Sequence, residues 1–271
     1  MHFHYMNDDS AEAHLRERIP TAIYSTAKEA SAVVAREISD VMNSRNAEGN
    51  STVLGLATGS TPTGVYQELA RLHKEESLSF AKVRTFNLDE YYGLGPTHPE
   101  SYAAFMERHL FSKVDIPSDV AVVPDGTVPR EEVSAYCESY EKSILEAGGI
   151  DIQVLGIGRT GHIGFNEPGS GRDSRTRLVE LDALTRADAA QDFLGEENVP
   201  PYAITMGVGT ILDARKIFLL AWGASKAAIL AKAVEDSISE ALPASFLQEH
   251  KDANVLVDEA AAAELSRHRH P

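Results

Sequence analysis

Apolar residues follow two patterns along the chain. Short unbroken runs are typical of buried strands, and longer stretches with apolar positions every three or four residues are typical of amphipathic helices. Strands are predicted over 52–57, 83–88, 120–123, 151–155, 177–181, 216–222 and 254–257. Helices are predicted over 27–45, 62–74, 99–112, 129–147, 225–235 and 258–266.

Strands that alternate with helices predict an α/β fold. We expect a doubly wound, mostly parallel, Rossmann-like sheet with helices on both faces. The chain has 271 residues with no internal repeat or linker, so we predict a single catalytic α/β domain over 21–266. Residues 1–20 are expected to be loosely held, and 267–271 to form a tail. Ligands of such sheets bind beyond the carboxyl ends of the strands.

Charge and cysteine content narrow the classes of partner. The formal net charge is −16, so nucleic acid and anionic membrane surfaces are not expected partners. A phosphorylated ligand would need local capture by backbone N–H groups and a few cations. The single cysteine, Cys137, fits a reducing cytoplasm and is predicted to be a structural thiol. No apolar stretch is long enough to span a bilayer, and His2 and His4, which could bind zinc, are more simply solvated.

The segment LGLATGSTPTGVY, residues 54–66, joins a strand to a helix. Pro62 opens the predicted helix, and Thr61 is its expected N-cap. The free N–H groups and positive dipole end of that helix suit a phosphate, with Gly59 allowing close approach and Ser60 and Thr61 donating hydroxyls. A plain capped helix start would have the same sequence.

The segment TFNLDEYYGL, residues 85–94, places Asp89 and Glu90 directly after a buried strand. Neighbouring side chains of extended chain point in opposite directions, so at most one of the two acids faces a given cleft. With an ordinary pKa of about 3.9, Asp89 is expected to be a carboxylate at neutral pH and a proton acceptor. A magnesium ligand and an exposed turn acid are the alternatives.

The segment LGIGRTGHIGFNEP, residues 155–168, is a strand followed by a glycine-rich turn that carries His162 and Glu167. An imidazole can transfer protons near neutral pH, and a carboxylate can orient and polarise it. The alternative is a tight connection that holds a buried histidine.

The segment FLLAWGASKAAIL, residues 218–230, places Lys226 in the first turn of a predicted helix. Cations are unfavourable at a helix N-terminus, so this position favours a bound anion in front of it. A Schiff-base lysine would be the other use of Lys226. Taken together, the four segments predict a phosphorylated small molecule that undergoes proton transfers.

Nearly the whole chain, about 20–265, resembles the glucosamine-6-phosphate deaminase (isomerase) family. The resemblance rests on LGLATGSTP, FNLDEYYGL, HPESY, LGIGRxGHIGFNEPG, SRT at 174–176, LTR at 184–186, AITMGVGTIL and GxSKA, in the family's order. The related 6-phosphogluconolactonases usually continue after Gly-His with a GHTASLFP-like string, whereas this chain continues with HIGFNEP.

The resemblance implies conversion of D-glucosamine 6-phosphate and water to D-fructose 6-phosphate and ammonium, with no cofactor and no metal. It implies that His162 opens the sugar ring with support from Glu167, and that Asp89 moves the C2 proton to C1. The residues that it assigns to the phosphate are Gly59, Ser60, Thr61 and Lys226.

Three positions depart from the family pattern. Thr160 stands where an acid or amide usually precedes Gly-His, so we expect His162 to be less stabilised as imidazolium. Gln191 stands where a phosphate-binding arginine is common, although Arg186 or another basic residue could replace it. Val179 replaces a basic residue that serves allosteric activation in some members, which argues against that regulation.

Two other functions are compatible with this fold. One is a 6-phosphogluconolactonase-type hydrolase, and the other is a sugar-phosphate-binding protein without catalysis. The partner expected in either case is a small sugar phosphate, with an amino-sugar phosphate favoured. The family includes monomers and larger assemblies, so a homo-oligomer is compatible with the sequence.

Overall fold

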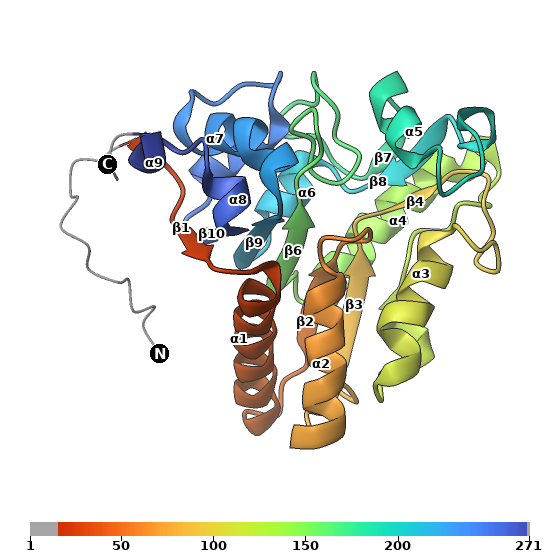
Figure 1. Cartoon of the computed structure of the whole chain (residues 1–271). Coiled ribbons are helices and arrows are strands. Elements are labelled where there is room, and N and C mark those ends of the chain that lie inside the picture. The colour runs from red at the N-terminus through yellow and green to blue at the C-terminus, as the bar shows by residue number, and fades with distance from the viewer. Residues whose placement is uncertain (1–15, 270–271) are drawn as a thin grey trace.

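A seven-stranded parallel sheet forms the centre of the computed structural model, which describes residues 16–269 (Figure 1). Every strand pair in this sheet is parallel, which confirms the predicted doubly wound architecture. In spatial order its strands are β1 (Thr21–Tyr24), β10 (Ala253–Asp258), β9 (Lys216–Ala221), β6 (Ile152–Gly156), β2 (Thr52–Leu56), β3 (Val83–Asn87) and β5 (Ala121–Val122).

Helices cover both faces of this sheet because its strands are apolar on both sides. In β9, Phe218 and Leu220 pack on one face while Ile217 and Leu219 pack on the other. The first face is covered by α1 (Ala27–Ala47), α2 (Thr63–Glu76) and α3 (Tyr102–His109). The second is covered by α4 (Val133–Glu146), α6 (Val208–Leu212), α7 (Ala227–Glu235) and α8 (Glu259–Ala262).

A second, antiparallel sheet was not predicted. It consists of β4 (Asp89–Tyr91), β8 (Tyr202–Thr205) and β7 (Arg177–Glu180), in that order. The strand expected over 177–181 therefore exists, but it lies outside the parallel sheet. Only Leu88 separates β3 from β4, so the small sheet stands directly beyond the carboxyl end of β3. Helix α5 (Ala183–Ala189) follows β7.

Several predicted boundaries are wrong for local reasons. Thr61 is not an N-cap, because Pro62 takes that position and α2 begins at Thr63. Helix α3 begins at Tyr102 instead of residue 99, because the Ser101 hydroxyl accepts a hydrogen bond from the N–H of Ala104 at 3.0 Å.

The ends of the described chain are better anchored than predicted. Ile19 is buried, and the N–H of Arg18 donates to the carbonyl of Val234 at 2.9 Å. The predicted last helix is split into α8 and α9 (Ser266–Arg269), so 267–269 are helical instead of a tail. His2 and His4 lie outside the described residues. None of the helices within 16–269 has the length and apolar composition needed to cross a bilayer.

The chain changes direction at the centre of the parallel sheet. From β2 the sheet continues through β3 to β5 on one side, and through β6 to β9 and β10 on the other. Adjacent strands whose connections leave in opposite directions create a crevice at their carboxyl ends, which is where ligands bind in such folds. The loops that follow β2, β3 and β6 contain three of the four predicted site segments.

The opposite, amino end of β6 is held by a buried acid. Asp151 accepts the N–H of Val53 at 2.8 Å and pairs with Arg45 at 3.2 Å and with Arg215 at 2.9 Å. Its side chain is only 4% exposed. These contacts join β6 to β2 at the end of the sheet away from the crevice, so Asp151 is a structural residue.

We predict that Asp151→Ala lowers the free energy of unfolding by about 3 kcal/mol, because it leaves a buried donor and two cations without their acid. Asp173→Ala is the matched control, since Asp173 also pairs with an arginine but is 88% exposed. That variant should lose less than about 0.5 kcal/mol. Urea unfolding measures both, and equal losses would contradict this role for Asp151.

Candidate active site

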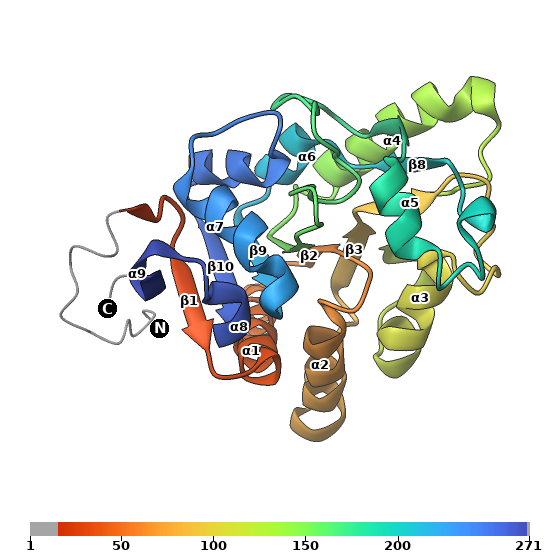
Figure 2. The same ribbon diagram turned by 45° about the horizontal axis from the view of Figure 1, so that its top comes forward.

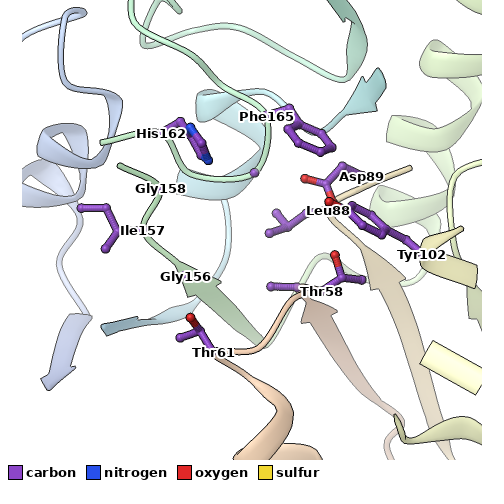
Figure 3. Close-up of a pocket in the computed structure, with 12 residues that line it drawn as sticks. Thr58, Thr61, Leu88, Asp89, Tyr102, Gly156, Ile157, Gly158, His162 and Phe165 are labelled. Atoms are coloured by element: carbon purple, nitrogen blue, oxygen red, sulfur yellow. The ribbon is translucent and has the colours of Figure 1, made fainter. Parts of the chain in front are cut away.

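A cavity of about 160 Å³ lies at the carboxyl ends of β2, β3 and β6 (Figure 3). The loops after these three strands supply most of its wall, and α3 and the turn after His162 close it. Its lining residues are Ala57, Thr58, Thr61, Leu88, Asp89, Tyr102, Gly156, Ile157, Gly158, His162, Gly164 and Phe165. The acid and the imidazole predicted from separate segments therefore border one space.

Asp89 and Glu90 point in opposite directions, as the strand pattern predicts. The Asp89 carboxyl faces the cavity (Figure 3). The Glu90 carboxylate accepts the N–H groups of Tyr91 at 2.8 Å, Tyr102 at 2.9 Å and Ala103 at 3.0 Å. Glu90 therefore caps α3 and fixes the short strand from which Asp89 projects.

The acid–base behaviour of Asp89 differs from the sequence expectation. Burial raises its pKa to about 8, and the nearby charge of Glu90 acts in the same direction. The pKa of Glu90 is itself raised to about 7, chiefly by burial, although three N–H donors oppose the shift. Asp89 is thus not a simple carboxylate at neutral pH. A carboxyl that titrates near neutrality can both accept and return a proton.

His162 belongs to a compact hydrogen-bonded cluster. Its Nδ1 lies 2.9 Å from the Thr160 hydroxyl and 3.1 Å from the Glu167 carboxylate. The Thr160 hydroxyl donates to the same Glu167 oxygen at 3.0 Å, so it is available to His162 only as an acceptor. Nδ1 must then carry a proton, which leaves Nε2 as the nitrogen for substrate chemistry.

The position of this imidazole requires a glycine at residue 158. A Cβ at residue 158 would lie 2.0 Å from Nε2 of His162, so any other side chain would displace the ring. The ring therefore lies against bare backbone beside the cavity (Figure 3).

Thr185, which was not predicted, is the third group that holds Glu167. Thr185 lies on α5 and is buried, and its hydroxyl donates a short hydrogen bond to Glu167 Oε1. Burial opposes ionisation of Glu167, but the hydrogen bonds from His162, Thr185 and Thr160 outweigh it and lower its pKa. Glu167 is therefore the anionic partner of His162. The LTR string contained Thr185, but nothing local indicated this contact.

The residues expected to bind phosphate do not all border the cavity. Thr61 lines the cavity, whereas Gly59 and Ser60 are exposed and lie outside its lining. Lys226 is the N-cap of α7, and its Nζ donates to the carbonyl of Ile157, a lining residue, at 2.8 Å. Lys226 thus stands beside the cavity rather than in its wall. Burial lowers the pKa of Lys226.

Other predicted positions have simpler environments. Gln191 is exposed after α5 and brings no cation, and Val179 packs in a hydrophobic cluster with Tyr91. Cys137 is buried on α4, and burial raises the pKa of its thiol to about 11, as expected for a structural thiol. Within residues 16–269, no three His, Cys, Asp or Glu side chains gather into a metal-binding group.

Comparison with known proteins places this chain in a family. Residues 25–257 match the family of glucosamine-6-phosphate isomerases and 6-phosphogluconolactonases. A glucosamine-6-phosphate deaminase of Shewanella halifaxensis is 53% identical over 79% of this chain and 81% of its own length. Glucosamine-6-phosphate deaminase 2 of Giardia intestinalis is 48% identical over 94% of this chain and 95% of its own.

Further similar proteins are one longer relative and two proteins of known structure. This chain spans 38% of a putative glucosamine-6-phosphate deaminase-like protein of Bacteroides thetaiotaomicron, at 45% identity. A monomeric glucosamine-6-phosphate deaminase of known structure superposes with a TM-score of 0.87, at 42% identity, over 91% of this chain and all of that one. The 6-phosphogluconolactonase of Trypanosoma brucei, with a TM-score of 0.73 over 92% of this chain and 99% of its own, is 22% identical and shares the fold.

The raised pKa of Asp89 predicts a pH-dependent stability. The folded protein keeps the Asp89 proton from about pH 4 to about pH 8, whereas the unfolded chain loses it near pH 4. Stability from this group therefore falls as pH rises through that interval. We expect Asp89→Asn to gain stability relative to the parent protein between pH 5 and pH 9 in urea titrations. A difference that is constant with pH would contradict the shift.

Proposed function

The chain belongs to the family of glucosamine-6-phosphate isomerases and 6-phosphogluconolactonases, and we propose that it is a glucosamine-6-phosphate deaminase. Its reaction converts D-glucosamine 6-phosphate and water to D-fructose 6-phosphate and ammonium. The observation that supports this most directly is that Asp89 and His162, whose imidazole is held by Glu167, border one cavity. The residues named all come from one chain, so a monomer suffices for the chemistry.

The phosphate would bind at the side of the cavity where Thr61 lines the wall and Lys226 stands beside it. Thr61 immediately precedes the N-terminus of α2, where unpaired N–H groups and the helix dipole favour an anion. Nζ of Lys226 reaches the same side through Ile157. A phosphate held there leaves the sugar ring extended toward His162 and Asp89.

Ring opening is assigned to His162. Nε2 takes the proton of the anomeric hydroxyl and returns it to the ring oxygen, so the cyclic hemiacetal becomes an open-chain aldehyde. While the imidazole carries the extra proton, Glu167 stabilises the positive charge through Nδ1–H. Thr160 and Thr185 keep the Glu167 carboxylate in place.

Isomerisation and deamination are assigned to Asp89. As a carboxylate, it removes the proton from C2 of the aldehyde and delivers it to C1 of the resulting enolamine. The product is an imine at C2, which water hydrolyses to the ketone with release of ammonium. The substrate ammonium at C2 favours the ionised form of Asp89, because a nearby positive charge opposes the rise in pKa caused by burial.

The hydrolase alternative uses this fold with different chemistry. A lactonase needs water activated beside an ester carbonyl, whereas here a buried carboxyl faces the cavity opposite an imidazole that is held by a carboxylate. The relatives of higher sequence identity are deaminases, and the HIGFNEP string is the deaminase form. A cytoplasmic location is part of the proposal, since the lone Cys137 is a free thiol.

We expect purified protein to release fructose 6-phosphate and ammonium in equal amounts from glucosamine 6-phosphate. Asp89→Asn should lower kcat by roughly a hundredfold to ten-thousandfold, because the amide cannot accept the C2 proton. Coupled detection of both products measures this. Unchanged turnover in Asp89→Asn would remove the assignment, and release of 6-phosphogluconate from its lactone would favour the hydrolase.

Thr160 allows a second test. Thr160→Asp adds a negative charge beside His162 and should move the acidic limb of the kcat/KM profile to higher pH, because the imidazolium is stabilised. Thr160→Asn is the neutral control and should leave that limb in place. Profiles that move equally in both variants would show that geometry, not charge, matters at this position.

A further inference from the structure

Helix α5 contacts the loop after β6 at two points on one face. Thr185 donates to Glu167, and one turn later Asp188 pairs with Arg159, at 2.7 Å between Oδ1 and Nη1. Residues three apart on a helix share a face, so both contacts hold α5 against the same loop. In Figure 2, α5 and α7 lie on the two sides of this loop.

The charges of Arg159, Asp188 and Lys226 act on one another where the loop passes α7. The pKa of Lys226 is lowered, mainly by burial. The negative charge of Asp188 opposes this shift, and the positive charge of Arg159 adds to it. Lys226 is fixed to the loop by its hydrogen bond to Ile157, two residues before Arg159. Lys226 and the Arg159–Asp188 pair therefore lie near enough for their charges to act on one another, beside a residue that lines the cavity.

This arrangement is unusual for a structural ion pair. Arg159 and Asp188 are 55% and 41% exposed, and an exposed pair contributes little to stability. Arg159 and Lys226 bring two positive charges against the one negative charge of Asp188, in a protein whose total is −16. Such a local excess is what a dianion needs when the rest of the protein repels it.

We propose that Arg159 is a second phosphate-binding cation, and that the substrate phosphate displaces Asp188 from it. This rests on the proposed function. A phosphate offers more charge and more acceptor oxygens than a carboxylate, and the planar guanidinium can contact two of its oxygens at once. Asp188 then acts as a competitor that occupies Arg159 until the phosphate binds.

Competition between Asp188 and the phosphate distinguishes phosphate binding by Arg159 from an ion pair that only holds α5 in place. If Arg159 binds the phosphate and Asp188 competes, substitutions of the two residues act on KM in opposite directions. If the pair only holds α5 in place, both substitutions loosen the same helix and act in the same direction.

The test measures kcat and KM for glucosamine 6-phosphate and the inhibition constant of inorganic phosphate. Arg159→Gln should raise both KM and the inhibition constant about tenfold with kcat nearly unchanged, since uniform binding is lost. Asp188→Asn should lower both about threefold, and Arg159→Lys should fall between Arg159→Gln and the parent protein. The double variant should match Arg159→Gln.

Arg36→Gln is the matched control. Arg36 pairs with Glu76 at 2.8 Å with 49% and 40% exposure, on α1 and α2 away from the cavity, and its loss should leave KM unchanged. A KM for Arg159→Gln within about twofold of the parent, or a KM raised by Asp188→Asn, would overturn the proposal. If the parent protein shows no turnover at all, the proposed function fails first, so the two failures are distinguishable.

Discussion

The site depends on one constraint of chain topology, the reversal of the strand order between β2 and β6. These strands are neighbours, yet the next strand of the parallel sheet after β2 is β3 on one side, and the next after β6 is β9 on the other, reached through β7 and β8 of the small sheet. The cavity lies at the carboxyl ends of these two strands, where the order reverses. The interior between the same strands is tightly filled, because a Cβ at Gly55 would lie 2.0 Å from Oε1 of Gln153. The sheet is thus closely packed between these strands, and the cavity opens at their carboxyl ends.

Burial at this open end gives the site its acid–base character. Asp89 and Glu90 lie next to each other in the sequence and are both buried, so the ionised form of each is disfavoured. Glu90 is compensated by three N–H groups, whereas Asp89 has the cavity in front of it. Across the cavity, Glu167 has three hydrogen-bonding partners and stays anionic. The Asp89 carboxyl is therefore suited to exchange a proton, and the Glu167 carboxylate is suited to hold a negative charge.

Much of the fold could be predicted because long apolar runs and amphipathic stretches encode it directly. Strands β2, β3, β6 and β9 were found for that reason, and so were Asp89 and His162, which follow two of them. The strands β4 and β8 are three and four residues long and form only through their pairing, so no local pattern indicates them. Thr185 reaches Glu167 and Asp188 reaches Arg159 only because α5 folds back on the loop. The pKa of Asp89 depends on its burial in the folded chain, which no local pattern indicates.

The most direct test is a crystal structure with an unreactive open-chain analogue of the amino-sugar phosphate. We expect C2 of the analogue to lie within reach of the Asp89 carboxyl, its oxygen at C1 to face His162, and its phosphate to lie between Thr61 and Lys226. An analogue bound away from this cavity, or one whose C2 is remote from Asp89, would contradict the claim that these groups act on one substrate.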